Sequence, residues 1–167
     1  MIHLHYFHQK RGYTCGPASM KMIFDFFGLR IGEEKLKKLL KANKKIGTKH
    51  LPLIKLALKN GFYCFVHNNS LLNDVKSLVD RDLPVIVHYI EPLTNEEHYS
   101  VIIGYKRNKI IMNDPWAGKN FKIKISDFEQ RWHGEGNKKW MMAISRKPFD
   151  VGKQYFPKST FIQLSKK

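Results

Sequence analysis

The sequence has few cysteines and no long apolar run. Only Cys15 and Cys64 occur among 167 residues, which excludes the disulfide framework of small secreted domains. No run of about 18 apolar residues exists, so no transmembrane helix is predicted. The start, MIHLHYFHQK, lacks the charged opening and apolar core of a secretory signal. These absences favour a reduced, cytoplasmic setting without a membrane segment.

Acidic residues are also scarce, with 14 Asp plus Glu against 30 Lys plus Arg and a formal net charge of +16. Such a surface attracts acidic partners at low salt, although lysines that only solvate the surface are the simpler alternative. No nucleic-acid-binding motif accompanies the charge, so we expect no nucleic-acid partner. A role for this charge in binding would therefore favour an acidic peptide. The residues carry no signal for an oligomeric state.

Repeats, low-complexity tracts and evident linkers are absent as well. The composition, 43% hydrophobic and 26% charged, is that of a globular chain with its own core. We predict a single domain over 1–167, with a helical lobe over about 1–80, a sheet lobe over about 81–146 and an irregular tail over 147–167. Apolar residues of that tail could strap across the surface, namely Phe156, Phe161 and Ile162.

Hydrophobic periodicity divides the chain into a mainly helical half and a half rich in strands. Helices are predicted over 17–28, 33–43, 50–61, 70–82 and 126–129, and strands over 62–67, 83–90, 98–105, 109–114, 120–125 and 139–146. Ser70 and Ser126 suit the N-cap positions of their helices. Helices followed by an antiparallel sheet give an α+β fold class.

Cys15 stands directly before Gly16 and Pro17, at the expected start of the first helix. A helix N-terminus and a neighbouring imidazolium lower a thiol pKa from about 8.5 to about 3.5–7.5, which makes a nucleophilic thiolate. A buried cysteine that merely occupies a helix start is the structural alternative, and the local pattern leaves both open. Cys64 lies between aromatic residues of a strand and is predicted to be a small core residue.

A catalytic cysteine needs a histidine base that the fold brings near. His98 opens a predicted strand directly after the polar loop EPLTNEE, where a fixed side chain can face a cleft. His3, His5 and His8 form a polar N-terminal cluster, but no nearby cysteine or carboxylate completes a metal site. We therefore predict no metal and no cofactor.

The imidazole in turn needs an acceptor, and the next strand ends with Asn113 and Asp114. Neighbours on a strand point to opposite faces, so only one of them can meet His98. A two-residue turn at Arg107-Asn108 would put Asn113 on the face of His98. A three-residue turn that begins at 106 would put Asp114 there, with Asn108 in the left-handed conformation. The residues alone leave this choice open.

Thiol attack on a carbonyl also needs donors for the oxyanion. The backbone N–H of Cys15 is one candidate, and the side-chain amide of Gln9, upstream in the chain, is another. A surface glutamine is the alternative for Gln9.

Taken together, Gln9, the CGPAS motif at Cys15, the HYSVIIGY strand at His98 and the NDP motif at Asp114 resemble the papain-like bacteriocin-processing cysteine peptidase family. The order, the settings and the separations of these motifs are similar, over about residues 5–145. The resemblance implies a papain-like cysteine peptidase fold, and here a stand-alone member of the family.

The resemblance also implies a role for each of these residues. Cys15 would be the nucleophile, His98 the base and acid, Asp114 the residue that orients His98, and Gln9 an oxyanion donor. The substrate would be a peptide or protein, cut after a Gly-Gly leader or at another peptide or isopeptide bond. Two alternatives remain: an acyl or amide transferase that uses the same residues, and a catalytically silent peptide-binding module.

Overall fold

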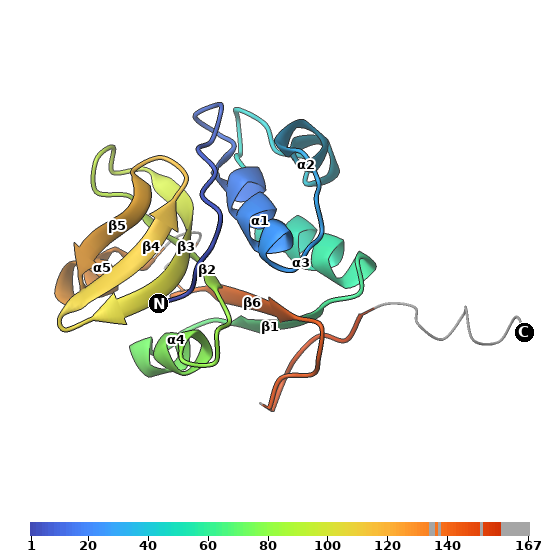
Figure 1. Ribbon diagram of the computed structural model, residues 1–167. Coiled ribbons are helices and arrows are strands. Elements are labelled where there is room, and N and C mark those ends of the chain that lie inside the picture. The colour runs from blue at the N-terminus through green and yellow to red at the C-terminus, as the bar shows by residue number, and fades with distance from the viewer. Residues whose placement is uncertain (134–135, 137, 151, 158–167) are drawn as a thin grey trace, which may run out of the picture.

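The computed structural model describes residues 1–133, 136, 138–150 and 152–157, and it has the expected α+β architecture (Figure 1). The helices are α1 (Cys15–Phe26), α2 (Glu33–Leu39), α3 (His50–Lys59), α4 (Leu72–Val79) and α5 (Ile125–Arg131). The strands are β1 (Tyr63–His67), β2 (Val85–Ile90), β3 (Glu97–Lys106), β4 (Lys109–Asp114), β5 (Gly118–Lys124) and β6 (Met141–Ser145). They form one six-stranded sheet in the order β1-β6-β2-β3-β4-β5, and each pair of neighbouring strands is antiparallel.

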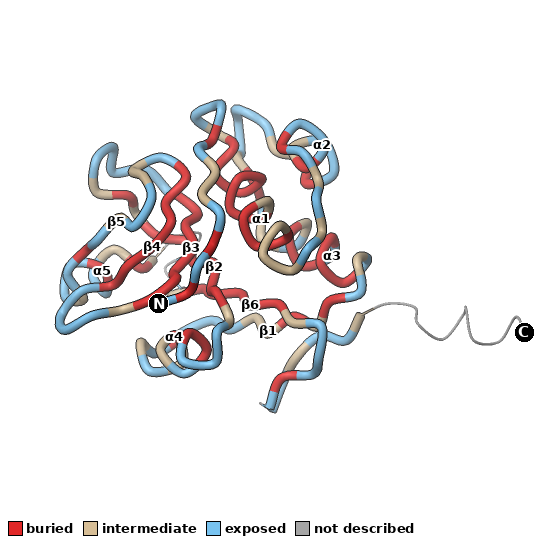
Figure 2. Tube along the Cα trace, in the orientation of Figure 1, coloured by how far each residue is buried: buried red, intermediate tan, exposed pale blue. Residues whose placement is uncertain are grey.

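The helices cover the sheet on two sides. Figure 1 shows α1, α2 and α3 together above the sheet and α4 below it. Helix α1 packs against β3, while α5 contacts β2, β4 and β5. Figure 2 shows that α1 and the central strands carry most of the buried backbone. The site-bearing elements α1, β3 and β4 therefore lie against the core.

Strand β1 joins the sheet although it lies in the first half of the chain. It pairs with β6, the last strand, with Tyr63 opposite Ser145 and His67 opposite Met141. The sheet therefore draws residues from both sides of the predicted lobe boundary near residue 80. The domain limits themselves stay a prediction.

Helix α1 begins and ends where the sequence indicates. Cys15 is its first residue, and Pro17 lies in the first turn, where a missing N–H removes no helical hydrogen bond. Gly28 follows the helix with φ +80°, a left-handed conformation that favours glycine, and its N–H donates to Asp25 O. The helix start thus holds the cysteine in one place.

Two predicted helix caps are wrong. Helix α4 begins after Leu71, whose N–H donates to the Asp74 carboxylate at 2.7 Å, whereas the Ser70 hydroxyl donates to His67 O. Helix α5 already begins at Ile125, so Ser126 lies inside it and caps nothing. The observed N-cap is Leu71 in α4, one residue after Ser70, and Lys124 in α5, two residues before Ser126.

The β3–β4 hairpin combines the two registers that the sequence left open. Its turn has two residues, with Lys106 paired to Lys109, and Arg107, not Asn108, takes the left-handed conformation at φ +54°. A bulge between Ile102 and Gly104 then shifts the register, so that Val101 pairs with Asn113. Beyond the bulge, Asp114 lies on the face that a three-residue turn would have given it.

Part of the tail runs along the open edge of the sheet. Tyr155 exchanges two backbone hydrogen bonds with Cys64, at 2.8 and 3.0 Å. Phe156 is exposed, and its ring contacts Tyr63 edge-on. The predicted contacts of Phe161 and Ile162 lie outside the described residues. Of the helices in the described ranges, none is both long and apolar enough to cross a membrane.

Candidate active site

The thiol of Cys15 lies at the first turn of α1 and is nearly buried, with 7% of the residue exposed. It is hydrogen-bonded to the side chain of His98, and backbone N–H groups of Tyr99 and Gly16 also point to it. Helix α1 packs on β3, which carries His98 and Tyr99. The packing of one helix on one strand therefore brings the two side chains together.

His98 connects the thiol to a buried carboxylate. Its Nε2 atom lies 2.8 Å from Oδ1 of Asp114, which has no exposed surface. The bulge in β3 is the reason that Asp114 faces His98, since it turns the end of β4 by one residue. Asn113, the alternative acceptor, instead donates to Leu4 O at 3.1 Å and accepts from Asn120 N–H.

The three groups shift one another's protonation. Burial raises the pKa of Cys15, but the hydrogen bond and charge of His98 outweigh it, so the thiol pKa lies below its ordinary value. Burial lowers the pKa of His98, whereas its bonds to Asp114 and Cys15 raise it above its ordinary value. Burial also raises the pKa of Asp114, and His98 lowers it overall. The arrangement favours a thiolate beside an imidazolium.

The Asp114 carboxylate is held by more than the histidine. Its Oδ1 accepts the N–H groups of Trp116 and Ala117 at 2.9 and 2.8 Å, so the residue also forms the turn before β5. Its Oδ2 accepts the hydroxyl of Tyr89 at 2.8 Å. Tyr89 is fully buried in β2, where its ring contacts His98 edge-on. Sequence reasoning missed Tyr89, because only the β2–β3 pairing brings it beneath the carboxylate.

Gln9 lies in an N-terminal segment that runs along the sheet. Ile2 N–H donates to Ile103 O at 2.7 Å, and Gln9 N–H donates to Pro115 O at 3.0 Å. The Gln9 side chain is buried at 3% exposure. Its Nε2 donates to Arg11 O at 2.8 Å, and its Oε1 is buried and has no hydrogen-bond partner among the described residues.

Two cavities flank the Cys15–His98 pair. The thiol-side pocket, about 450 Å³, contains Cys15 but not His98, and its lining includes Lys45, Thr48 and Tyr99. The smaller imidazole-side pocket, about 80 Å³, contains His98 but not Cys15. Its lining comprises Gln9, Gly12, Glu91, Thr94, Glu96, Glu97, His98 and Trp116. An extended peptide that passes over Cys15 and His98 would occupy both pockets.

Two histidines, the buried His88 and the half-buried His50, lie at the thiol-side pocket, and sequence reasoning gave them no role. Nε2 of His50 and Nδ1 of His88 are 3.0 Å apart. His50 stacks on Trp140 at 4.0 Å between ring centroids, and His88 stacks on Tyr99 at 4.4 Å. Burial lowers the pKa of His50 to about 3 and that of His88 to about 4. The pair is therefore neutral near pH 7 and forms a rigid wall.

Three other residues, Cys64, Ser100 and Trp116, have different environments. Cys64 is fully buried in β1, and burial raises its thiol pKa to about 12. Ser100 is buried and donates to Met112 Sδ at 3.2 Å, not to the site. Trp116 stays 44% exposed at the rim of the imidazole-side pocket. Within the described part of the chain, no three His, Cys, Asp or Glu side chains are grouped to hold a metal.

Comparison with known proteins identifies similar chains. The model of the Peptidase C39 family matches residues 3–136. The transport/processing ATP-binding protein ComA of Streptococcus pneumoniae strain R6 is 30% identical over 133 residues. That match covers 78% of this chain but only 18% of ComA, so this chain corresponds to a small part of that relative.

Solved structures share the fold. The crystal structure of the peptidase domain of Streptococcus ComA, a bifunctional ABC transporter involved in a quorum-sensing pathway, matches with TM-score 0.72 and 25% identity, over 87% of this chain and 100% of that one. A double glycine motif protease from an AMS/PCAT transporter, solved in complex with the leader peptide, matches with TM-score 0.68 and 20% identity, over 85% and 91%.

Proposed function

The chain belongs to the peptidase C39 family and is a cysteine peptidase, and from this premise we propose that it hydrolyses a peptide bond with Cys15, His98 and Asp114 as its triad and Gln9 as an oxyanion donor. The observation that carries the proposal is the unbroken series of contacts from the thiol through His98 to Asp114. A cysteine peptidase needs these three groups in this order.

In the first step the Cys15 thiolate attacks the carbonyl carbon and forms a C–S bond. The carbonyl oxygen becomes an oxyanion and accepts the backbone N–H of Cys15, which has no helical partner at the start of α1. The oxyanion would accept a second hydrogen bond from Nε2 of Gln9, whose side chain is held by its bond to Arg11 O.

In the second step the intermediate collapses and the C–N bond breaks. The His98 imidazolium gives its proton to the leaving nitrogen, which departs as an amine. Water then attacks the thioester while His98 accepts the proton of the water, and the C–S bond breaks to release the carboxylic acid. Asp114 keeps Nε2 of His98 protonated, so that Nδ1 exchanges the proton with the thiol and the leaving group.

The proposed substrate is a peptide whose leader ends in Gly-Gly, cut after the second glycine. The family resemblance supports this class, and so does the fold shared with the leader-bound double glycine motif protease. Helix α1 approaches the loop before α3 closely, since a Cβ on Gly16 would lie 2.6 Å from Thr48 Oγ1, and both segments line the pocket that holds the thiol. Glycines before the scissile bond would let a substrate backbone come close to Cys15 between them.

A synthetic peptide with an acidic leader, a Gly-Gly end and a short following segment tests the proposal. Mass spectrometry should give a single cut after the second glycine for the wild type and for Cys64→Ala, the matched control that removes the other thiol. Cys15→Ala and His98→Ala should give no product. Cleavage by Cys15→Ala would overturn the assignment of the nucleophile.

A competing amine separates hydrolysis from transfer. With water and an added primary amine together, a peptidase releases mainly the free acid from the acyl-enzyme, whereas an acyl transferase releases mainly the amide. The amide as the main product at low amine concentration would contradict the peptidase proposal and leave the triad assignment intact.

A further inference from the structure

We propose that the imidazole-side pocket receives the segment after the scissile bond, and that Glu96 selects a basic residue, Lys or Arg, in the first or second position of that segment. This inference rests on the proposed function, because it assumes the triad. It adds the direction in which the substrate lies and the chemistry preferred on its leaving side.

The direction follows from where the two reacting groups are exposed. The thiolate bonds to the carbonyl carbon, and the imidazolium protonates the nitrogen on the other side of the same bond. Cys15 lines the thiol-side pocket and His98 lines the imidazole-side pocket. The acyl part of the substrate therefore leads into the thiol-side pocket, and the leaving amine leads into the imidazole-side pocket.

The charges of the two pockets differ. Lys45 and Lys49 line the thiol-side pocket, together with one carboxylate, Glu97. Three glutamates and no lysine or arginine line the imidazole-side pocket. This is a marked departure in a chain with 30 basic and only 14 acidic residues. A cation on the leaving side would therefore avoid the positive field that the rest of the molecule exerts.

The loop that carries these glutamates is firmly held. The buried Glu91 carboxylate accepts the N–H groups of Leu93 and Thr94 at 2.6 and 2.8 Å, and also the Thr94 hydroxyl at 2.8 Å. The backbone N–H of Glu91 donates to Glu96 O at 2.9 Å, and Nη1 of Arg131 donates to Oδ1 of Asn95 at 2.9 Å. Glu91 is therefore a structural residue, while Glu96 presents an exposed carboxylate from a fixed loop.

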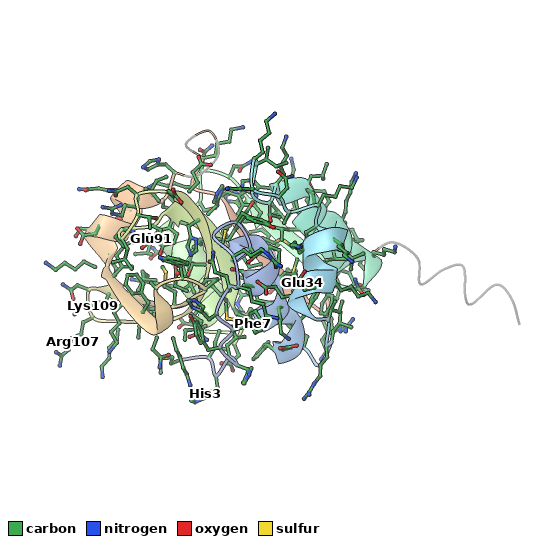
Figure 3. All side chains as sticks on the ribbon, turned by 90° about the horizontal axis from the view of Figure 1, so that it is seen from above. His3, Phe7, Glu34, Glu91, Arg107 and Lys109 are labelled. Carbon is green, nitrogen blue, oxygen red and sulfur yellow. The ribbon has the colours of Figure 1, made fainter. Side chains whose placement is uncertain are left out.

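A second observation in the same pocket points to a donor-rich ligand. Oε1 of Gln9 is buried and has no hydrogen-bond partner, although the residue is only 3% exposed. It is an acceptor, like the carboxylates around it, so an entering N–H or ammonium group would satisfy it. Figure 3 shows Glu91 on the sheet side of α1 and Glu34 on the opposite side, near α2. The acidic loop is therefore separate from the carboxylate of Glu34.

The test compares two peptides that share the acyl side, with its Gly-Gly end, and differ only in the residue after the bond, Lys in one and Glu in the other. We expect kcat/KM for the Lys peptide to exceed that for the Glu peptide by about threefold to tenfold at low salt, which is the size of one or two exposed charge contacts. The ratio should fall toward one at high salt.

Variants assign the preference to the loop. Glu96→Lys should remove the preference for the Lys peptide, whereas Glu129→Gln on α5, an exposed residue outside both pockets, should keep it. Equal kcat/KM for the two peptides in the wild type, or a preference that survives Glu96→Lys unchanged, would overturn the inference while cleavage itself continues. Failure to cut either peptide would instead count against the proposed function.

Discussion

The two cysteines of the chain have the same side chain and opposite environments. Both are nearly or fully buried, at 7% exposure for Cys15 and 0% for Cys64. Burial alone raises the pKa of Cys64 to about 12. Cys15 experiences the same desolvation, but the imidazole of His98 and two backbone N–H groups reverse its effect. The difference in thiol pKa therefore comes from the neighbouring groups and not from exposure.

Alkylation by iodoacetamide at pH 6 measures this difference. Only the thiolate reacts, and it is present above the thiol pKa, so a lowered pKa extends the reactivity of Cys15 below the range near pH 8.5 where a free thiol titrates. We expect Cys15 to react about 100-fold faster than Cys64. In His98→Ala the pKa of Cys15 rises and this advantage disappears near pH 6. Equal rates in the wild type would contradict an activated pair.

Tyr89 bonds to Asp114, so it would position the proposed triad without touching the reacting atoms. Tyr89→Phe leaves Oδ2 of a buried carboxylate without its donor, which costs about 1–3 kcal/mol of folding free energy. We also expect kcat to fall about tenfold with little change in KM, since the carboxylate is then held through Oδ1 alone and orients His98 less firmly. Urea unfolding and peptide kinetics give the two values.

Tyr105→Phe is the matched control for this prediction. Its hydroxyl also donates to a carboxylate, Asp80, at 3.0 Å, but at an exposed position far from the site. Both the stability and the kinetics should stay close to wild type. Equal losses in kcat for Tyr89→Phe and Tyr105→Phe would argue against a positioning role for Tyr89.

Among the elements, the contact between the start of α1 and the segment before α3 is the tightest constraint on the site. A Cβ on Gly16 would lie 2.6 Å from Thr48 Oγ1 and 2.7 Å from its Cβ. The Tyr99 hydroxyl donates to the carbonyl of Thr48 at 2.8 Å, so this segment cannot move away from α1 without breaking that hydrogen bond. Glycine is required at position 16 by this close approach, and the backbone angle does not demand it.

Gly16→Ala should therefore lower the free energy of unfolding by about 1–3 kcal/mol through overpacking, and it should lower activity because the helix start moves. Adding Thr48→Gly removes both clashing atoms and should restore part of the loss, whereas Gly32→Ala, with no atom within 4 Å of its added Cβ, should be nearly neutral. Urea denaturation measures all three. An unchanged Gly16→Ala variant would show that the segment yields after all.

At the scale of the whole molecule, positive charge dominates the surface. Lysine and arginine tips project around most of the outline in Figure 3, including Arg107 and Lys109 at the β3–β4 turn. The acidic loop over 91–97 interrupts this field beside the active site. For the proposed substrate, this field would favour the approach of an acidic leader, and the loop would favour a basic segment after the bond.

Salt should consequently slow the capture of an acidic leader. The Debye length falls from about 30 Å at 0.01 M to about 8 Å at 0.15 M ionic strength. We expect kcat/KM for a peptide with an acidic leader to fall about tenfold over this range, while a neutral-leader peptide changes little. Steady-state kinetics with the two peptides measures this. A flat response to salt would assign the lysines to solubility alone.

Several conclusions about this protein came from its sequence alone. The α+β class, the strands and the helix that starts at Cys15 follow from periodicity and from Pro17 and Gly28, because these signals are local. The resemblance to the cysteine peptidase family rests on four motifs, and the family match confirms it. The roles of Gln9, Cys15, His98 and Asp114 stay predictions.

Tertiary structure decided what depends on pairing across the chain. The sequence left open whether Asn113 or Asp114 shares a face with His98. A bulge between Ile102 and Gly104 puts Asp114 there, even though the turn has only two residues. Tyr89 and the unpartnered oxygen of Gln9 became visible only when strands and segments distant in sequence were placed side by side. A one-residue shift reverses every side chain of a strand, and no local pattern encodes such a shift.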